Sequence, residues 1–396
     1  MLLTNKQEQG LKLAIDRFVK GEKYTVISGY AGTGKTTLVK FIIEALSSYG
    51  INPDEDVCYV AYTGKAAEVL RKKGNKNTTT LHKLLYDFFP KGNGTFYKKA
   101  KLSLEYKVVV VDEVSMAPKD MMELLYKHNV YIICLGDPFQ LPPIKKDEDN
   151  GLLSNPHIFL DEVMRQAAES EIIRLTMDIR EGKPIEYKQG KEVQILRKEE
   201  LNTGMLMWAD QVLVGTNKTR ATINNQMRDL LGRGDMPENG DKVICLRNYW
   251  ENFAMNGDDV LVNGTVGYID NCHIYHNRPN LNGTIRDIEV LNANFKSDSG
   301  LDFGSLEMDN HMILTGEKCV DYKTAYLLWK KYKKNNPIPL EFTYAYAITG
   351  WKAQGSEWDK VLVLEEKFPF DKEEHQKFLY TCATRAIKKL VIVRNE

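Results

Sequence analysis

The sequence predicts an α/β fold with two parallel-sheet domains, one carrying a small β-hairpin insertion and the other a β-rich insertion. In both halves of the chain, short apolar runs alternate with helical patterns, as expected for strands joined by crossover helices. Two stretches interrupt this alternation, one with a hairpin turn signal and one with short strand-like runs between Gly and Asn residues. A length of 396 residues is enough for two or three domains, each with its own core.

Four apolar runs in the first half are predicted to be buried strands, because they are short, continuous and rich in β-branched residues. They are Thr25–Ser28, Val57–Ala61, Val108–Glu113 and Tyr131–Leu135. Helical patterns lie between them, at Leu38–Leu46, Lys65–Lys73 and Pro118–His128. This alternation predicts one parallel sheet with helices on both faces.

The same alternation returns in the second half of the chain. Strands are expected at Gln211–Asn217, Lys360–Glu366 and Leu390–Val393, and helices at Thr219–Leu231 and Lys372–Lys388. The sequence therefore predicts a second α/β domain.

Two insertions interrupt these domains. Leu84–Tyr106 contains an Asn93-Gly94 dipeptide, which is a strong hairpin signal. Met236–Asn336 contains the runs KVICLRN, NGTVGYI, IEVLNANF and HMIL, which indicate a small β-barrel or sandwich. The predicted boundaries are 1–83 and 107–165 for the first domain, 84–106 for the hairpin, 166–235 and 337–396 for the second domain, and 236–336 for its insertion.

Composition is that of a soluble globular protein, with 43% hydrophobic and 27% charged residues. No run of about 18 apolar residues occurs, and the Met-Leu-Leu start leads directly into polar residues, so we expect no membrane span and no signal peptide. The six cysteines are scattered without a C-x-x-C pair, which favours reduced thiols in a cytoplasmic protein. Secreted, membrane and collagen-like classes are excluded.

Charge is balanced overall but not locally. There are 54 Lys and Arg residues against 54 Asp and Glu residues. Between Tyr62 and Lys107, however, eleven basic residues stand against three acidic ones. Local distribution decides which partners a surface attracts, so the neutral net charge does not argue against a nucleic-acid partner.

A phosphate-binding loop is predicted at Gly29–Thr36, where GYAGTGKT matches G-x-x-x-x-G-K-[ST] between a predicted strand and a predicted helix. Glycines let backbone N–H groups close around phosphate oxygens at the positive end of the helix. Lys35 would reach the β- and γ-phosphates of ATP, and the Thr36 hydroxyl would bind Mg²⁺. The expected nucleotide-binding residues of this loop are Gly32, Thr33, Gly34, Lys35, Thr36 and Thr37.

Polar residues also stand at the end of the third predicted strand and in the loop after the fourth. Asp112 and Glu113 close the run VVVVDE, and a carboxylate pair at that end of a strand lies beside the phosphate loop in this topology. Asp112 would hold Mg²⁺, directly or through water, and Glu113 would polarise the attacking water. Gln140, in GDPFQLPP, would contact the γ-phosphate; the alternative is a Pro-rich loop that closes the domain.

The order of strings along the chain resembles that of the superfamily 1 DNA helicases, in the 5′→3′ branch of RecD-like and phage Dda-like proteins. The strings are LTNKQEQ, GYAGTGKTT, AYTGKAA, TTLH, VVDEVSM, GDPFQLPP, VMRQ, TNKTR, NGTVG, YAITGWKAQGSEWDKV and YTCATRA. The resemblance implies two RecA-like P-loop NTPase domains, a hairpin pin and an SH3-like barrel as the second insertion. It also implies ATP and Mg²⁺ as cofactors.

The resemblance assigns further residues to the nucleotide. Gln7 would read the adenine edge; the alternative is a solvated polar face on the first helix. Arg165 and Arg385 would reach the γ-phosphate from the second domain, with ordinary surface salt bridges as the alternative. Gly355 and Glu357 would lie near the γ-phosphate and ribose.

Candidate DNA-binding residues follow from helix starts, aromatic side chains and the resemblance. Thr63 and Lys65 open a predicted helix, where amides and a hydroxyl bind phosphate well. Phe88 and Phe96 belong to the hairpin, which either splits the duplex or packs its aromatics onto its own domain. Trp351 stands where relatives commonly have His, and it either stacks on a base or lies in the core. The full set is Thr63, Lys65, Thr80, His82, Phe88, Phe96, Asn217, Thr349 and Trp351.

These features together predict a monomeric ATP-driven motor that moves 5′→3′ on single-stranded DNA and separates the duplex ahead of it. Its partners would be single-stranded DNA and single-strand/duplex junctions, with replication or recombination proteins as further partners in a bacterial or phage-infected cell. One alternative is a translocase that displaces proteins without unwinding. Another is a P-loop phosphotransferase, which would leave Arg165, Arg385 and the second α/β domain unexplained.

Overall fold

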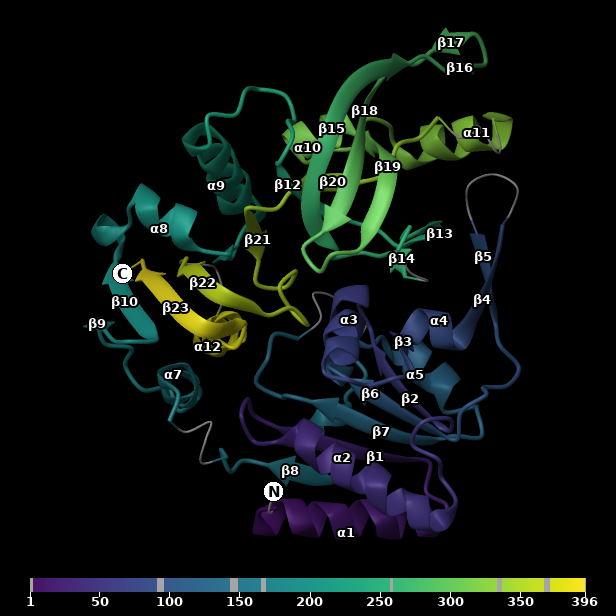
Figure 1. Cartoon of the computed structure of the whole chain (residues 1–396), viewed down its shortest axis with the longest axis vertical. Helices are drawn as coiled ribbons and strands as arrows, with labels where there is room; N and C mark the ends of the chain where they lie inside the picture. The colour runs from purple at the N-terminus through teal and green to yellow at the C-terminus, as the bar shows by residue number, and fades with distance from the viewer. Residues whose placement is uncertain are drawn as a thin grey trace. The chain divides into compact units, whose positions relative to one another are not determined.

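The chain is divided into two units, both drawn in Figure 1. The computed structural model describes residues 3–90, 96–142, 149–164, 169–256, 259–332, 337–366 and 371–395, with only the backbone at 88–90, 96–97 and 250–251. Unit 1 comprises Met1–Tyr86, Ala100–Gly215 and Ala353–Glu396, and unit 2 comprises Asp87–Lys99 and Thr216–Lys352. Unit 1 holds strands of both predicted α/β domains, so the boundaries between those domains stay a prediction.

The first sheet of unit 1 is parallel throughout, with its six strands in the order β3-β2-β6-β7-β1-β8. Its strands are β1 (Tyr24–Gly29), β2 (Val57–Ala61), β3 (Thr78–Thr80), β6 (Val108–Asp112), β7 (Tyr131–Gly136) and β8 (Ile158–Leu160). Its helices are α1 (Asn5–Val19), α2 (Lys35–Leu46), α3 (Gly64–Lys72), α4 (Leu81–Leu85) and α5 (Lys119–Leu125). The four valines of β6 are at most 1% exposed, so both faces of the sheet are covered, as a continuous apolar run predicts.

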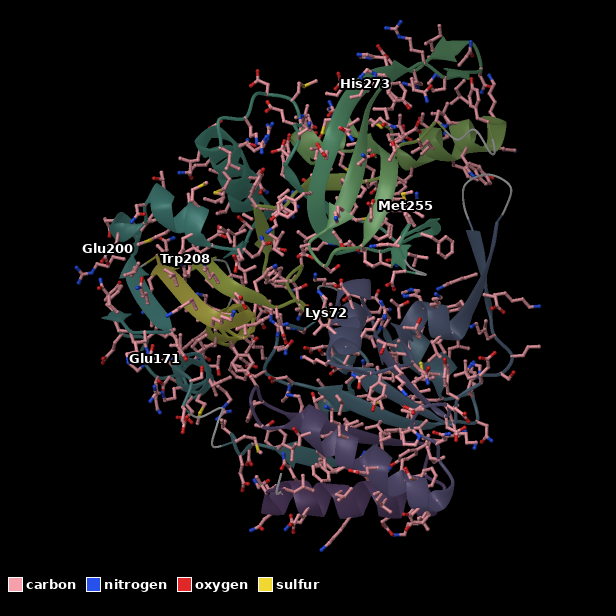
Figure 2. The ribbon with its side chains drawn as sticks, in the orientation of Figure 1. Lys72, Glu171, Glu200, Trp208, Met255 and His273 are labelled. Atoms are coloured by element: carbon pink, nitrogen blue, oxygen red, sulfur yellow. The ribbon has the colours of Figure 1, made fainter. Side chains whose placement is uncertain are left out.

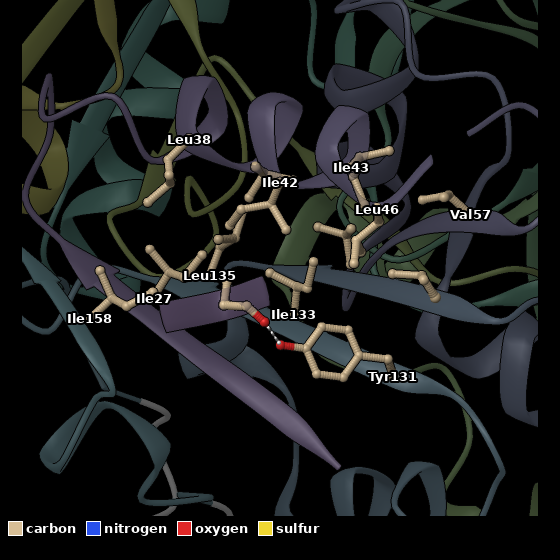
Figure 3. Packing of buried hydrophobic residues seen from close by; sticks show 14 of the residues in the cluster. Ile27, Leu38, Ile42, Ile43, Leu46, Val57, Tyr131, Ile133, Leu135 and Ile158 are labelled. Carbon is tan, nitrogen blue, oxygen red and sulfur yellow. Dashed lines mark hydrogen bonds between the residues drawn. The ribbon is translucent and has the colours of Figure 1, made fainter. Parts of the chain in front are cut away.

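One face of this sheet is covered by aliphatic side chains of α2 (Figure 3). Leu38, Ile42 and Leu46 recur at helical spacing and are fully buried with strand residues such as Ile27 and Ile133. Burial of each such side chain contributes about 1.5–3 kcal/mol. This packing fixes the start of α2, and with it the loop after β1, relative to the sheet.

Unit 1 contains a second set of strands in the order β11-β22-β23-β10-β9, parallel except for β9 at the edge. They are β9 (Lys188–Gln189), β10 (Val193–Arg197), β11 (Gln211–Val214), β22 (Trp358–Leu364) and β23 (Ala386–Arg394), with α7 (Glu171–Arg180), α8 (Thr203–Trp208) and α12 (Lys372–Ala383). Glu171, labelled in Figure 2, accepts hydrogen bonds from the backbone N–H groups of Glu192 (2.8 Å) and Val193 (3.1 Å). These bonds join α7 to β10.

Unit 2 is built on an antiparallel sheet in the order β19-β18-β15-β12-β20. Its elements are α9 (Asn217–Leu230), β12 (Lys242–Cys245), β13 (Tyr249–Phe253), β14 (Val260–Leu261), β15 (Val266–Asn277), β16 (Asn280–Leu281), β17 (Thr284–Ile285), β18 (Ile288–Ser297), β19 (Asp302–Asp309), α10 (Asn310–Thr315), α11 (Tyr322–Tyr332), β20 (Phe342–Tyr344) and β21 (Ala347–Thr349). Ile288 and Val290 of β18 pack with Leu328 of α11. β4 (Tyr86–Pro90) and β5 (Phe96–Ala100) pair where the sequence predicts a hairpin, and Asn93-Gly94 lies outside the described residues.

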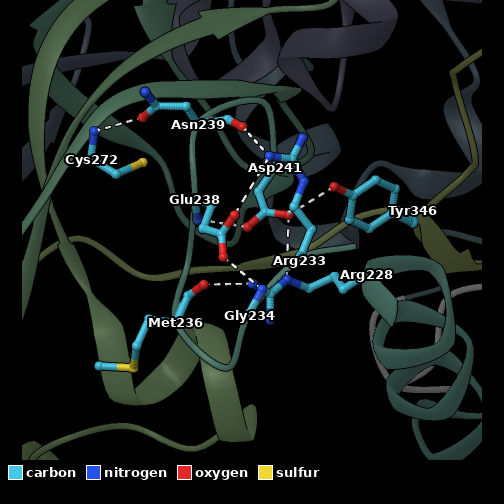
Figure 4. A network of polar contacts seen from close by, with 9 residues as sticks. All are labelled: Arg228, Arg233, Gly234, Met236, Glu238, Asn239, Asp241, Cys272 and Tyr346. Carbon is cyan, nitrogen blue, oxygen red and sulfur yellow. Dashed lines mark hydrogen bonds and ion pairs between the residues drawn. The ribbon is translucent and has the colours of Figure 1, made fainter. Parts of the chain in front are cut away.

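A buried ionic network joins three segments of unit 2 (Figure 4). Arg228 of α9 lies 3.3 Å from Asp241 Oδ1, and these side chains are 7% and 0% exposed. Tyr346 donates to the same oxygen at 2.8 Å, and the backbone N–H of Glu238 donates to Asp241 Oδ2 at 2.8 Å. A buried carboxylate is tolerated only when its oxygens are bonded. The network therefore ties α9 to the start of β12, which follows Asp241, and to the segment between β20 and β21, which holds Tyr346.

One predicted helix end and one predicted strand end are wrong. The helix expected at Lys372–Lys388 ends at Ala383, and Ala386 already begins β23, whose ladder with β22 competes for these residues. Asn217, predicted as the end of a strand, is the first residue of α9. The hydroxyl of Thr216 caps that helix by accepting from Thr219 N at 3.1 Å.

The strand predicted at HMIL is also wrong. These residues lie in α10, because Asp309 caps the helix by accepting from Met312 N at 2.9 Å. A short apolar run does not by itself distinguish a strand from a buried helical turn.

Two global properties agree with the composition. No helix in the described part of the chain is both long and apolar enough to cross a bilayer. All six cysteines are free thiols, as their spacing predicts.

Candidate functional site

Three loops meet at the carboxyl edge of the first sheet. β6, β7 and β1 are neighbours and run parallel, so the residues that follow them lie side by side. These residues are the phosphate loop after β1, the pair Asp112 and Glu113 at the end of β6, and the loop that begins with Asp137 after β7. Open α/β sheets bind ligands at this edge.

The phosphate loop joins β1 to α2 through two glycines in a left-handed conformation. Gly32 has φ 75° and Gly34 has φ 79°, values that L side chains rarely adopt. Gly34 precedes α2 without offering a side-chain acceptor, which leaves the first N–H groups of the helix to an anion. Lys35 Nζ donates to the carbonyl oxygens of Gly29 (2.6 Å) and Tyr30 (3.0 Å), and its third N–H can serve a phosphate oxygen.

The three threonines of this segment differ in exposure. Thr33 is 1% exposed and its hydroxyl donates to Tyr30 O at 2.8 Å, so it stabilises the loop. Thr36 is exposed at the start of α2, and Thr37 is half-buried. Thr36 therefore has the accessible hydroxyl that the motif requires.

Gln7 is bonded to the phosphate loop. Its Nε2 lies 3.2 Å from Thr33 O and 3.4 Å from Gly34 O, and its Oε1 accepts from Thr4 N at 3.0 Å. A β-carbon on Gly34 would lie 2.4 Å from this amide. The alternative of a solvated polar face is wrong, because Gln7 is 1% exposed. Its contact with adenine stays a prediction.

The carboxylate pair lies at the end of β6 on strained backbone. Glu113 has φ 49° and ψ 47°, in the left-handed region, and its N–H donates to Asp112 Oδ1 at 2.9 Å. Removal of the Asp112 carboxyl from water, and then the nearby charge of Glu113, raise its pKa to about 6. The ammonium of Lys35 opposes this shift.

The donor set fits Mg²⁺ carried with a nucleotide. Mg²⁺ prefers hard oxygen ligands, and the two predicted ligands are the Asp112 carboxylate and the exposed Thr36 hydroxyl. Burial and the neighbouring charge of Glu113 raise the pKa of Asp112, and a bound cation would offset this cost of its negative charge. When bound, the ion would neutralise charge on the phosphates.

Gln140 approaches the carboxylate of Glu113. Its Nε2 lies 3.5 Å from Glu113 Oε1, and the residue is 8% exposed. Its Oε1 is buried without a hydrogen-bond partner in the described part of the chain. The structure therefore brings Lys35, Asp112, Glu113 and Gln140 to one edge, as the sequence predicts from strand ends.

Of the two arginines expected to reach the γ-phosphate from the second α/β domain, the structure describes one. Arg385 is 5% exposed and its guanidinium donates to Thr381 O, Ser356 O and Thr384 Oγ1, at 3.2, 3.2 and 3.0 Å. The alternative of a surface salt bridge is wrong for Arg385, because the arginine is itself buried and these three acceptors are neutral. Arg165 lies outside the described residues. Phosphate contact by either arginine stays a prediction.

Gly355 and Glu357 lie in the turn before β22. Gly355 has φ 73°, and a β-carbon there would lie 2.7 Å from Ala66 Cβ, so the turn approaches α3 closely. Glu357 is exposed and pairs with Lys73 at 3.3 Å. Its contact with a ribose stays a prediction.

Sequence reasoning missed Asp137 and Tyr380. Asp137 is 2% exposed, and Tyr380, on α12, donates a hydrogen bond to its Oδ2 at 2.5 Å. Asp137 lies just after the predicted strand Tyr131–Leu135, much as Asp112 lies at the end of an earlier strand. Its position after a strand could therefore have marked it as a candidate site residue. Nothing local marks Tyr380, since its partner is 243 residues away.

Two domain families match the chain. The AAA domain family matches residues 4–200, and the UvrD-like helicase C-terminal domain family matches residues 344–393. The first match contains the three loops described above, and the second contains the turn before β22 and α12.

Curated relatives include two helicases. The ATP-dependent DNA helicase dda of Enterobacteria phage T4 is 31% identical over 194 residues, covering 46% of this chain and 43% of the relative. The ATP-dependent RecD2 DNA helicase of Deinococcus radiodurans is 32% identical over 171 residues, covering 41% of this chain and 22% of the relative. Over the matched residues, the chain is a homologue of these two DNA helicases. The matched part spans less than half the length of either relative.

Solved Pif1 helicases share the fold of this helicase homologue. Pif1 from Candida albicans has a TM-score of 0.52 at 18% identity, covering 100% of this chain and 95% of that chain. Pif1 from Bacteroides, in complex with ADP-AlF3 and single-stranded DNA, has a TM-score of 0.51 with the same identity and coverage. At this identity the likeness shows the fold alone. It confirms the α/β fold with parallel sheets, whereas the hairpin and SH3-like insertions stay predictions.

The candidate DNA residues of the helicase homologue in unit 1 lie at helix starts. Thr63 caps α3 by accepting from Ala66 N at 3.2 Å, and Thr80 caps α4 by accepting from Lys83 N at 3.2 Å. Lys65 is 8% exposed with its Nζ 3.7 Å from Glu68. His82 packs against the ring of Tyr62 at 5.5 Å between centroids. Their contact with DNA stays a prediction.

The remaining DNA candidates belong to unit 2. Asn217 is exposed at the first position of α9, Thr349 ends β21, and Trp351 follows it partly buried. The side chains of Phe88 and Phe96 lie outside the described residues. Because Trp351 is only partly buried, stacking on a base and packing in the core both stay open for it.

Proposed function

We propose that this protein is an ATP-dependent 5′→3′ DNA helicase, which moves along single-stranded DNA and separates duplex DNA. One observation carries the proposal. The edge of the first sheet brings together a phosphate loop, a carboxylate pair and Gln140, while α12 is bonded to two of the same loops through Tyr380. A nucleotide site bonded to a second sheet is what a motor needs to convert hydrolysis into movement.

The chain's own residues divide the chemistry of hydrolysis. Lys35 and the N-terminus of α2 hold the β- and γ-phosphates, and Asp112 with Thr36 would hold the nucleotide's Mg²⁺. Glu113 accepts the proton of the attacking water, and Gln140 orients that water or the γ-phosphate. Arg385 and Arg165 supply positive charge as the γ-phosphate is transferred.

The DNA contacts are assigned by position and charge. The basic stretch from Tyr62 to Lys107 includes α3 and α4, whose helix starts carry Thr63 and Thr80. The β4–β5 hairpin serves as the pin that splits the duplex, and the antiparallel sheet of unit 2 is an SH3-like barrel inserted in the second RecA-like domain. Trp351 stacks on a base, a contact worth about 1–3 kcal/mol.

Relatives support both cofactor and partner. The phage T4 relative is an ATP-dependent DNA helicase, and a solved Pif1 structure contains ADP-AlF3 and single-stranded DNA. By analogy, this chain acts as a cytoplasmic monomer on single-strand/duplex junctions in replication, recombination or repair.

ATP hydrolysis with and without an oligo-dT strand tests the nucleotide half of the proposal. We expect the DNA to stimulate hydrolysis and Lys35→Ala to abolish it. Lys40→Ala, on an exposed turn of the same helix, is the control and should keep the wild-type rate. Hydrolysis that survives Lys35→Ala contradicts the proposal.

Deletion of Phe88–Lys99 separates the helicase from a translocase that does not unwind. The deletion should abolish strand separation and keep DNA-stimulated hydrolysis, because the pin contributes only to splitting base pairs. Unwinding that survives the deletion would show that the hairpin is not the pin.

A further inference from the structure

The loop that follows β7 is held at both ends by side chains that come from far along the chain. At its start, Tyr380 donates to Asp137 Oδ2 at 2.5 Å. At its end, the N–H of Leu141 donates to Thr381 Oγ1 at 2.9 Å, and Gln354 Nε2 donates to Leu141 O at 2.7 Å. All of these residues lie in unit 1. The loop therefore takes its position from α12 and the turn before β22 as well as from its own strand.

Tyr380 contributes a second bond that the others do not. Its hydroxyl also accepts from the N–H of Ala31, in the phosphate loop, at 2.9 Å. Because β1 and β7 are neighbouring strands, one hydroxyl oxygen links the loops that follow both of them. The ring is 1% exposed and packs edge-on against Phe139 at 5.2 Å.

The buried carboxylate of Asp137 makes this link more than a packing contact. Asp137 is 2% exposed, and its two oxygens accept from Tyr380 and from Phe139 N (3.0 Å). A buried carboxylate that loses a hydrogen bond is strongly disfavoured, so the loop would rearrange without the hydroxyl.

Gln140 lies between the two anchored ends. Its N–H donates to Asp137 O at 3.3 Å, and its side chain lies 3.5 Å from Glu113. The bonds of Tyr380, Thr381 and Gln354 therefore set the distance between Gln140 and the carboxylate assigned to the attacking water. Arg385 lies two residues beyond the end of α12, and its Nε donates back to Thr381 O at 3.2 Å.

We propose that Tyr380 is a positioning residue for ATP hydrolysis, acting by tying the phosphate loop and the Gln140 loop to α12. This inference rests on the proposed function, since it concerns the same nucleotide site. Tyr380 itself touches no reacting atom; it acts through Ala31, Asp137 and Gln140.

Tyr380→Phe removes the hydroxyl and keeps the ring that packs on Phe139. The matched control is Tyr131→Phe, because Tyr131 is also buried (6% exposed) and its hydroxyl also makes two bonds, with Thr25 Oγ1 (2.6 Å) and Ala14 O (2.9 Å). Tyr131 begins β7, at the end of the strand away from the loop. Both variants should lose similar thermal stability.

Steady-state hydrolysis with saturating oligo-dT distinguishes positioning from general stability. Tyr380→Phe should lower kcat at least tenfold with KM for ATP within twofold, because the phosphate contacts remain while Gln140 is misplaced. Tyr131→Phe should keep kcat within twofold. Thr381→Val, which keeps side-chain shape and removes the acceptor for Leu141 N–H, should show a smaller loss in the same direction.

Hydrogen exchange of the nucleotide-free protein tests the same link without turnover. Exchange at the amides of Ala31 and Leu141 should be at least tenfold faster in Tyr380→Phe and unchanged in Tyr131→Phe. Equal kcat in the two Phe variants, or unchanged exchange at both amides, overturns the positioning role. A wild-type protein without DNA-stimulated hydrolysis would instead overturn the proposed function, and the exchange measurement would still decide on Tyr380.

Discussion

Gln7 donates a hydrogen bond from Nε2 to the carbonyl oxygen of Thr33 at 3.2 Å, so the first helix is bonded directly to the phosphate loop. The same side chain completes a capping box with Thr4 at the start of α1. Gln7, which is predicted to recognise adenine, therefore also supports the phosphate loop. These two roles predict different consequences when its side chain is removed.

Gln7→Ala should lower the free energy of unfolding by roughly 1–3 kcal/mol, because Thr4 N loses its acceptor and the carbonyl oxygens of Thr33 and Gly34 lose the side-chain amide. Urea denaturation measures this change. If Gln7 also reads adenine, KM should rise for ATP and stay constant for GTP. An equal rise for both nucleotides would contradict adenine reading and leave loop support as its function.

Asp112→Asn should stabilise the nucleotide-free protein above pH 6 while abolishing hydrolysis. The Asp112 carboxyl has a folded-state pKa raised from 3.8 to about 6, so it binds its proton more tightly when folded. Its contribution to stability is therefore complete below pH 3.8 and is lost as pH rises through 6. Asn escapes this loss, which is on the order of 1–3 kcal/mol.

Thermal unfolding from pH 4.5 to 8 checks the Asp112 prediction. The advantage of Asp112→Asn should be largest at pH 8 and should shrink as pH falls below 6. Asp54→Asn, in an exposed ion pair with Lys76, is the control and should change the melting temperature little at any pH. A constant advantage across the range would mean that Asp112 does not titrate there.

Glu113→Gly should be more stable than Glu113→Ala by about 1 kcal/mol. The backbone at Glu113 has φ 49°, where a β-carbon is strained and glycine is not. Both variants should lose at least a hundredfold in kcat, because they lack the carboxylate. Chemical denaturation of the pair tests the strain, and equal stabilities would argue against it.

Asp241→Asn should destabilise unit 2 by about 3–5 kcal/mol, since it leaves the Arg228 guanidinium buried without its counter-charge. Asp359→Asn breaks the exposed pair with Lys388 and should cost less than about 1 kcal/mol. Denaturation curves of the two variants give the comparison. Similar small losses in both would show that the network in Figure 4 is hydrated in solution.

The first sheet and its loops could be predicted because their signals are local. Continuous β-branched runs such as Val108–Val111 indicate buried strands, and the glycines and Lys35 of the phosphate loop have fixed spacing. Parallel strands then place Asp112 and Glu113 beside that loop without any knowledge of tertiary contacts.

The rest depends on contacts that the sequence does not encode locally. Tyr380 meets Asp137 across 243 residues, and Gln7 is buried because the phosphate loop packs on it, although its helix reads as polar. HMIL is helical because Asp309 caps it, a signal that a short apolar run conceals. Arg385 could be predicted as a site residue from the string YTCATRA, but the groups that accept its hydrogen bonds could not be predicted.

Strand displacement tests the central claim most directly. Duplexes with a 5′ tail, a 3′ tail and no tail are incubated with the protein and ATP, and released strands are measured. Separation of the 5′-tailed duplex alone is the predicted result. Release only from the 3′ tail would contradict the polarity, and no release with DNA-stimulated hydrolysis intact would contradict the helicase in favour of a translocase.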